Sequence, residues 1–370
     1  MNPVLVSLLV NSAVLLLLGA VFYAAPSPQL SPRSVPFGVR VPPGRADAPE
    51  VHQERRRYRA LLLPAIAVLT AVSLGLGALT DSALVGSVAA LALCGVAAVL
   101  WFRAHQALTR AKEEGDWYRE LRQGAAMDTS LRTDPVRMPW LWVVPSLLVF
   151  AVSATAGAFA YPELPDTLLL PERSPSGTVH REFATTFWSA FSLVLVQLAV
   201  TLTMVGTVAA VLRARADVDA SRPRASAAEY RRRLSLIARS LLGVGALINV
   251  MLLGLSAMMW TGSRSGALLA VVVGVPTVLA LAGAAYPFLP MARGAATAGG
   301  EEDTGLVTRD DDRFWRGAGT VYLNADDPAV LVPKRVGMGW TVNLANRRFL
   351  AVCAVLLVLG AAAGVVLALG

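Results

Sequence analysis

The sequence predicts an all-α integral membrane protein with about eight transmembrane helices, and three observations lead to this fold class. First, 55% of the 370 residues are hydrophobic and 16% are charged, whereas a soluble domain has about 25% charged residues. Second, charged residues are excluded from a series of runs about twenty residues long, the length with which a helix crosses the hydrocarbon core. Third, Lys and Arg alternate between successive loops, which predicts an orientation in the membrane.

The predicted spans share this length, and none has an Asp, Glu, Lys or His near its middle. They are Val4–Ala24, Leu61–Ala78, Ala83–Phe102, Trp140–Tyr161, Phe187–Leu212, Leu236–Trp260, Ala267–Leu289 and Leu350–Leu369. No soluble domain of ordinary size fits between them, so we expect a multi-pass membrane protein.

Positive charge is concentrated in every second loop. Loops 25–60, 103–139 and 213–235 carry seven Lys or Arg each, and loop 290–349 carries eight. The alternate loops carry none, two and one. Because cytoplasmic loops retain positive charge, both termini are predicted to lie outside, and a small element before the last helix is predicted to lie in the cytoplasm.

The net charge of +8 therefore has a topological cause, and nucleic acid is not an expected partner. The lipid bilayer is the expected partner, with the Arg clusters near helix ends in contact with anionic headgroups. The basic residues are almost all Arg, with two Lys, which points to a GC-rich bacterial genome and hence to a bacterial plasma membrane.

Motifs for soluble chemistry are missing. The sequence has three His without a metal-binding spacing, and it has no Gly-x-Ser-x-Gly elbow and no phosphate-binding Gly-x-x-x-x-Gly-Lys loop. Cys94 and Cys353 lie in separate predicted spans, which excludes a disulfide framework. We therefore expect no enzymatic activity, no catalytic residue, no metal and no cofactor.

Three polar residues lie deep in predicted spans: Asn11, Gln197 and Asn249. Side chains of this type commonly hydrogen-bond across helices, and structural bonding of this kind is the favoured interpretation. The alternative function, a transporter or channel component, would use these three positions. A proton-coupled transporter would need an acidic acceptor within a span, and the predicted spans contain none near their middle.

The loop "YPELPDTLLLPERSPSGTVHREFATTF", from Tyr161 to Phe187, begins with a proline-stiffened turn where a helix leaves the membrane on the outer side. It resembles domain of unknown function 1648, the membrane domain associated with SdpI-type immunity and signalling proteins. Pro171 stands near the position of that family's histidine, and Gly177 matches with one inserted residue. The candidate site residues on this loop are Tyr161, Pro162, Leu164, Pro165, Asp166, Gly177 and His180.

Residues 309–348, the C-terminal element, are dense in polar and aromatic side chains. The passage "DDRFWRGAGTVYLNADDPAVLVPKRVGMGWTVNLAN" within it resembles domain of unknown function 5808. The residues that fall on the pattern are Thr341 and the candidates for contact with a cytoplasmic partner, which are Trp315, Tyr322, Asn324, Asp326, Asp327, Pro328, Lys334, Arg335, Gly337, Gly339, Trp340 and Asn343.

The element's chemistry permits several interpretations. Asn324–Pro328 is predicted to form a turn in which Asp side chains bond nearby backbone amides. The aromatic rings either anchor at the headgroup level or form a small core of the element itself. Capping or solvated carboxylates are favoured over a divalent-ion site at Asp310–Asp312 or at Asp326 and Asp327.

These features predict six parts along the chain. The parts are 1–60, the first helix and a Pro/Arg-rich loop; 61–138, a helical hairpin and a cytoplasmic helical loop; 139–290, a membrane domain with the external loop 162–186; 291–308, a linker; 309–348, the C-terminal element; and 349–370, the last helix. The resemblances imply a non-enzymatic, SdpI-like membrane protein. It would sense, or give immunity to, an extracellular peptide or toxin and signal to a cytoplasmic regulator protein.

Overall fold

The computed structural model describes residues 3–28, 31–80, 84–124, 135–174, 177–216, 218–287, 304–337 and 339–354, with the side chains of 3–7 and 170–181 left out. The chain is 68% helical. It divides into two compact units. Unit 1 comprises Met1–Met127, Ala214–Ser226 and Glu301–Gly370, and unit 2 comprises Asp128–Arg213 and Ala227–Gly300.

Among the described residues, six helical segments are long and apolar enough to cross a membrane. They are α2 (Pro49–Thr80), α3 (Leu84–Glu114), the segment Trp140–Glu163 that contains α5 (Val144–Ala160), α7 (Ser192–Leu212), α8 (Pro223–Trp260) and α9 (Gly266–Ala285). These six contain or overlap the second to seventh predicted spans, which confirms a multi-pass arrangement of apolar helices. The inside-outside orientation stays a prediction.

The first and last predicted spans are not among these six segments. Helix α1 (Pro3–Ala24) occupies the first predicted span, but its described apolar part, Leu8–Ala24, is shorter than the other six. Residues 347–354 begin a helix at the position of the eighth span, and the rest of Leu350–Leu369 lies outside the described residues, as does most of the linker 291–308.

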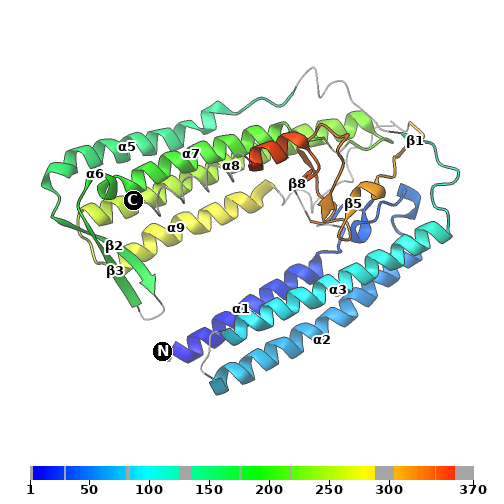
Figure 1. The fold of residues 1–370 in the computed structure, drawn as a ribbon, viewed down its shortest axis with the longest axis horizontal. Coiled ribbons are helices and arrows are strands. Elements are labelled where there is room, and N and C mark those ends of the chain that lie inside the picture. The colour runs from blue at the N-terminus through cyan, green and yellow to red at the C-terminus, as the bar shows by residue number, and fades with distance from the viewer. Residues whose placement is uncertain are drawn as a thin grey trace. The chain divides into compact units, whose positions relative to one another are not determined.

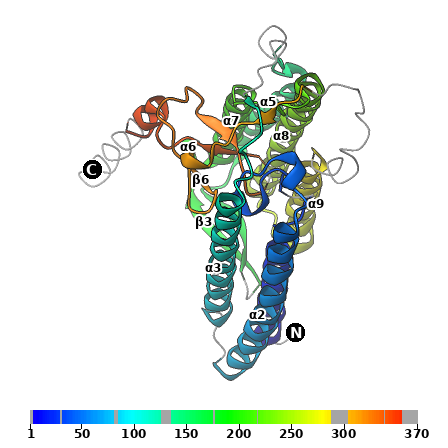
Figure 2. The same cartoon turned by 90° about the vertical axis from the view of Figure 1, so that its right-hand side faces the viewer.

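In unit 1, α1, α2 and α3 lie side by side (Figures 1 and 2). Their buried faces carry apolar residues such as Leu15, Leu62 and Leu93, which form one continuous core. Asn11 lies against Gly86, where an added Cβ atom would come within 2.2 Å of the Asn11 Cγ atom. The glycine therefore lets α1 and α3 approach closely.

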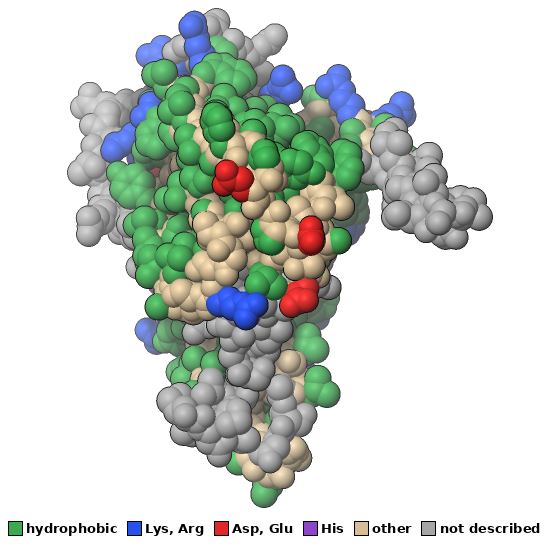
Figure 3. All heavy atoms as spheres, turned by 90° about the vertical axis from the view of Figure 1, so that its left-hand side faces the viewer, with side chains coloured by type: hydrophobic (Ala, Val, Ile, Leu, Met, Phe, Trp, Pro, Cys, Tyr) green, Lys and Arg blue, Asp and Glu red, His purple; other side chains and the backbone are tan. Residues whose placement is uncertain are grey.

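The apolar surface of the spans faces outward. Between 11% and 33% of the most apolar stretch of each of the six segments is buried inside the structure. Figure 3 shows hydrophobic side chains over much of the face that it presents, with few charged groups among them. Burial of apolar surface is the main favourable term in folding, so these faces require a covering, and a lipid bilayer supplies it.

In unit 2, polar side chains are buried among α5, α7 and α8. Ser146, Gln197, Thr201 and Asn249 are all less than 5% exposed. An apolar cluster that includes Val208 and Leu242 packs beside them. Polar bonding between helices is an ordinary means of association in lipid, where apolar contact alone gives little preference for a neighbouring helix.

The loop of unit 2 that is predicted to be external contains a β-hairpin, which the all-α prediction lacks. Strands β2 (Thr167–Ser174) and β3 (Gly177–Ala184) pair in antiparallel register, with Leu168 opposite Phe183. The β-branched and aromatic residues of "TLLL" and "TVHREFA" suit a strand, and the Pro-Ser-Gly passage suits a turn. Leu168 is fully buried against Ala190 and Met259, which fixes the base of the hairpin.

The C-terminal element also contains strands, so the all-α prediction is incomplete here too. Strands β5 (Trp315–Arg316) and β6 (Val321–Tyr322) form one antiparallel pair, and β7 (Leu331–Pro333) and β8 (Trp340–Val342) form another. A bridge between Tyr322 and Asn343 links the two pairs. Just before the element, β4 (Val307–Thr308) pairs with β1 (Gln123–Gly124).

Candidate functional site

The C-terminal element has a small core of its own. Trp315, Tyr322 and Val332 are buried together, with Phe314 packed against them. The ring centroids of Trp315 and Tyr322 lie 5.0 Å apart. For these two rings the structure favours the core over the headgroup anchor, whereas Trp340, on β8, stays partly exposed.

The turn at Asn324–Pro328 has the predicted side-chain bonds. The Asp326 amide donates to the Asn324 Oδ1 atom at 3.1 Å, and the Ala329 amide donates to the Asp327 Oδ1 atom at 2.9 Å. Asn343 is fully buried beside this turn. Its Nδ2 atom donates to the Asn324 carbonyl at 2.7 Å, and its Oδ1 atom accepts from the Asn324 amide at 3.1 Å. Asn343 therefore holds the turn through both ends of its amide.

Asp327 joins the turn to a distant segment of unit 1. The Arg215 guanidinium donates to the Asp327 Oδ2 atom at 2.6 Å, and the Tyr322 hydroxyl donates to the same oxygen at 3.0 Å. The Arg215 amide also donates to the Leu331 carbonyl at 2.9 Å. Arg215 is therefore held in place by both its backbone and its side chain.

Arg335 lies at the centre of the polar cluster and is 2% exposed. Its guanidinium donates to the carboxylates of Asp311 and Asp312, and to the Gly38 carbonyl at 2.8 Å. It also lies over the Trp315 ring, 4.8 Å from the centroid. A planar, permanently charged guanidinium suits two carboxylates and an aromatic face at once, a role that Lys would not fill.

These two aspartates and the neighbouring Asp310 also bind cations from the N-terminal part of unit 1, namely Arg40 in the loop between α1 and α2, and Lys112 on α3. The Arg40 Nε atom lies 2.7 Å from Asp311, and the Lys112 Nζ atom lies 2.6 Å from Asp310 and 2.7 Å from Asp312. The carboxylates of Asp310–Asp312 thus pair with Arg and Lys. Two of them also cap backbone amides as predicted, because the Asp312 amide donates to Asp310 at 3.1 Å and the Arg40 amide donates to Asp312 at 3.0 Å. Among the described residues, no group of three His, Cys, Asp or Glu side chains is placed to hold a metal.

Two glycines let the element approach the N-terminal helices backbone to backbone. Gly38 (φ +79°) and Gly319 (φ +84°) both adopt the left-handed region that favours glycine. A Cβ atom on Gly319 would lie 2.6 Å from the Gly38 Cα atom, and one on Gly38 would lie 2.4 Å from the Ala318 carbonyl oxygen. The Trp101 indole donates to that same oxygen at 3.2 Å. The element is therefore docked on the N-terminal part of unit 1 by close backbone packing as well as by charge.

The surroundings of Asp311 and Tyr322 shift the pKa values of both groups. Burial raises the pKa of Asp311, but Arg40 and Arg335 outweigh it and lower the pKa to about 2. Burial raises the pKa of Tyr322, so its hydroxyl stays protonated and donates to Asp327. The cluster is a network of ion pairs, called here the ionic clamp, formed by Arg40, Lys112, Arg215 and Arg335 with Asp310, Asp311, Asp312 and Asp327.

The candidate partner-contact residues separate into two groups. Tyr322, Arg335 and Asn343 are buried, and Gly337 and Gly339 adopt positive φ angles of 74° and 100° in the β7–β8 turn. These residues build the element and dock it. The exposed candidates are Asp326, Pro328 and Lys334.

Four candidates of the loop that is predicted to be external lie at the base of the hairpin in unit 2: Tyr161, Leu164, Pro165 and Asp166. The Tyr161 ring packs against Phe191 with centroids 5.9 Å apart. The Asp166 carbonyl accepts from the Thr185 amide at 2.8 Å, the Pro165 carbonyl accepts from the Thr185 hydroxyl, and Leu164 packs in the apolar cluster around Leu168. The other candidates are Pro162, in the turn after α5, and Gly177 and His180, on β3.

Two of the deep polar residues meet in unit 2. The Gln197 Nε2 atom donates to the Asn249 carbonyl at 3.2 Å, and the Asn249 Nδ2 atom donates to the Thr201 hydroxyl at 2.8 Å. The Gln197 Oε1 and Asn249 Oδ1 atoms are buried without a hydrogen-bond partner among the described residues. Asn11 belongs to unit 1 and is not part of this network.

Sequence reasoning missed the other half of the clamp. Arg40, Lys112 and Arg215 counted only toward the orientation of the loops, and Gly38 carried no motif. The one signal was complementary charge, because the run of three aspartates at Asp310–Asp312 follows three basic loops in the chain. Charge alone does not identify which of many Arg residues will be the partner.

The comparisons with known proteins agree with part of this description. Residues 325–349 match the family described as "Family of unknown function (DUF5808)". That match covers the Asp326–Pro328 turn, Arg335 and Asn343, and supports the resemblance of the C-terminal element. No curated protein and no solved structure matches the chain. The resemblance of the external loop to domain of unknown function 1648 has no support from these comparisons and stays a prediction.

Proposed function

We propose that this chain is a non-enzymatic, SdpI-like protein of the bacterial plasma membrane that senses, or gives immunity to, an extracellular peptide or toxin and signals to a cytoplasmic regulator protein. The observation that carries this proposal is the docked C-terminal element, in which buried Arg335 binds Asp311 and Asp312 of the element and the Gly38 carbonyl of the loop between α1 and α2. An element held so firmly presents a fixed surface, and a fixed surface reduces the ordering cost of binding a protein.

The surface proposed for the regulator is the exposed part of the element. It carries Asp326, Pro328 and Lys334, and the exposed apolar side chains of Leu323 and Leu344. Leu344 and Leu323 lie close together, because the Leu344 amide donates to the Tyr322 carbonyl at 3.2 Å. Apolar side chains beside charged ones are typical of transient protein interfaces.

The proposed receiver of the extracellular signal is the hairpin of β2 and β3, in the orientation that the Lys and Arg distribution predicts. Its base is anchored by Leu168 and by the Thr185 bonds, which leaves its far end as the part that projects from the anchor. A hairpin of this kind offers backbone groups and side chains to a peptide, as sheet edges commonly do.

A complementation experiment in a bacterial host without its own copy of the gene tests the proposal. The full chain, a chain with residues 170–181 replaced by Gly and Ser, and the double variant Asp326→Lys/Lys334→Glu would be expressed at equal membrane levels. We expect the full chain to restore survival beside toxin-producing competitors and to alter host transcripts, and both variants to fail. Equal survival and equal transcripts for all three chains would contradict the proposal.

A transporter or channel component is the second candidate function. The observation that favours it is the pair of buried amide oxygens on Gln197 and Asn249, which lack a partner among the described residues and are suited to a water or a cation. Flux of K⁺, Na⁺ and small neutral solutes would be measured in liposomes containing the purified chain. This candidate predicts flux that Gln197→Ala and Asn249→Ala stop and Ser256→Ala, a buried residue bonded to its own helix, leaves intact.

A further inference from the structure

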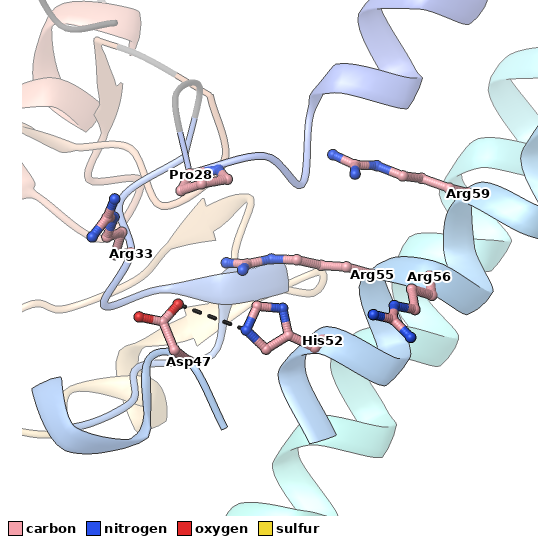
Figure 4. A pocket seen from close by; sticks show the side chains of 7 residues that line it. All are labelled: Pro28, Arg33, Asp47, His52, Arg55, Arg56 and Arg59. Carbon is pink, nitrogen blue, oxygen red and sulfur yellow. Dashed lines mark ion pairs between the residues drawn. The ribbon is translucent and has the colours of Figure 1, made fainter. Parts of the chain in front are cut away.

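A strongly basic cavity lies in unit 1, between the start of α2 and the loop that precedes it. Its volume is about 320 Å³. Its charged and titratable lining residues are Arg33, Asp47, His52, Arg55, Arg56 and Arg59. Figure 4 shows the side chains of Arg55 and Arg59 extending from α2 into the same space, with Arg33, Asp47 and Pro28 on the opposite side. The cavity is separate from the ionic clamp around Arg335.

Arg55 is the central observation at this cavity. It is 8% exposed, and its Nε atom is buried without a hydrogen-bond partner among the described residues. The Nε atom of Arg59, one helical turn further along α2, is likewise buried without a partner. A buried cationic donor that lacks a partner costs more free energy than almost any other polar group, so native structures rarely leave one unoccupied.

The arginines outnumber the acidic groups at this cavity. Among the described lining residues Asp47 is the one that is acidic; its carboxylate attracts Arg55 and lies 3.9 Å from the exposed His52 ring. On the outer side of the same helical turn, Arg57 is paired with Glu54 at 3.7 Å. Of the four arginines at the start of α2, Arg57 has an acidic partner outside the cavity. The other three line the cavity, which has a single aspartate.

The position of the cavity, near the start of a predicted span, would make it accessible to an anionic lipid headgroup or to a soluble anion. Arg59 comes two residues before the predicted span Leu61–Ala78. Its guanidinium lies over the ring of Tyr23, at the end of α1, 4.9 Å from the centroid. Tyrosine at a helix end is typical of the headgroup level, and basic residues at that level attract anionic groups.

We propose that this cavity binds a phosphate group, with Arg55 and Arg59 as its principal ligands and Arg33 and Arg56 as peripheral cations. Guanidinium groups bind phosphate oxygens through paired N–H donors, which is the geometry that arginine supplies best. A cavity of about 320 Å³ accepts a free phosphate or the phosphate and glycerol of a lipid headgroup. Binding would satisfy the buried Nε atoms and neutralise mutually repelling cations.

The test uses the full chain purified in detergent and two probes. Inorganic phosphate binding is measured by equilibrium dialysis with labelled phosphate, and phosphatidylglycerol binding is measured by native mass spectrometry, with phosphatidylcholine as the comparison lipid. The test variant is Arg55→Gln/Arg59→Gln. The control is Arg57→Gln, which removes a charge from the same helix outside the cavity.

We expect the wild-type chain to bind at least one probe specifically, and the double variant to weaken that binding at least tenfold while the control stays within twofold. Binding of phosphatidylglycerol alone identifies a headgroup site, and binding of inorganic phosphate alone identifies a soluble anion. Binding of both identifies recognition of the phosphate group itself. Absence of binding to either probe, or an equal loss in the control, would overturn the proposal.

A second variant guards against a folding defect in the double variant. Arg33 is exposed at the mouth of the cavity, so Arg33→Gln removes a lining charge without disturbing the packing of α2. We expect this variant to keep the wild-type elution volume and helical content and to bind the same probe several-fold more weakly. Affinity equal to that of the Arg57→Gln chain would overturn the proposal.

Discussion

Replacing Arg335 with Met should release the C-terminal element from the N-terminal helices. Arg335 is 2% exposed and bonds to two carboxylates and to the Gly38 carbonyl. Removing one partner of a buried ion pair costs about 3–5 kcal/mol, because the remaining charges lose their compensation. Asp311 keeps Arg40 and Asp312 keeps Lys112, so we expect a loss at the lower end, about 3 kcal/mol.

The assay is hydrogen exchange of backbone amides in the element, measured by mass spectrometry on the purified full chain. Exchange through local opening reports the free energy of that opening, and about 3 kcal/mol corresponds to a loss of protection of about a hundredfold. The loss should be confined to residues 311–346 and to the loop around Gly38, with α7 and α9 unchanged.

Lys334→Met is the matched control, because Lys334 is the exposed neighbour of Arg335 and its backbone pairing with Gly339 is retained. It removes the same charge and should change protection less than threefold. Protection in Arg335→Met within threefold of wild type would refute the reasoning, since it would mean that the clamp contributes little to docking.

The remaining predictions concern the same contacts and the hairpin. Gly319→Ala should undock the element, since φ is +84° and the added Cβ atom would lie 2.6 Å from the Gly38 Cα atom. Gly305→Ala is the control, because φ is +64° and the added Cβ atom would meet open space, so it should cost only about 1 kcal/mol of backbone strain. Hydrogen exchange of the element's backbone amides distinguishes the two variants. Because the pKa of Asp311 is lowered from 3.8 to about 2, docking stability should be constant above pH 4 and fall as pH drops from 3.8 to 2, by about 2 kcal/mol in the exchange assay. Leu168→Ala should cost about 2–5 kcal/mol and make the hairpin susceptible to brief proteolysis, with the clamp unaffected.

The helices were predictable because their signal is local. An apolar run of about twenty residues needs only its own composition to be recognised, and six of the predicted spans fall on helices of the structure. The lead-in of α2 from Pro49 and the extension of α3 to Glu114 belong to the same helices but are polar, so hydropathy alone places the span boundaries short of the helix ends.

The clamp was not predictable because its partners are distant in the chain. Arg40 and Asp311 are 271 positions apart, and nothing in the sequence near either residue specifies the other. The Asn324–Pro328 turn could be inferred, since an Asx turn depends on neighbours within a few residues. The hairpin of β2 and β3 was missed because four prolines and a polar passage within Tyr161–Phe187 favoured an irregular loop, while the pairing of Leu168 with Phe183 is a cross-strand effect.

The orientation of the chain is the central claim, because signalling from the hairpin to the C-terminal element requires them to face opposite sides of the membrane. Single cysteines at Glu163 and at Asp326, in a chain with Cys94→Ser and Cys353→Ser, would be labelled in intact cells with a membrane-impermeant maleimide. The account predicts labelling of the Glu163→Cys chain in intact cells, and of the Asp326→Cys chain only after the membrane is permeabilised. Labelling of Asp326→Cys in intact cells, or protection of Glu163→Cys until permeabilisation, would contradict the account.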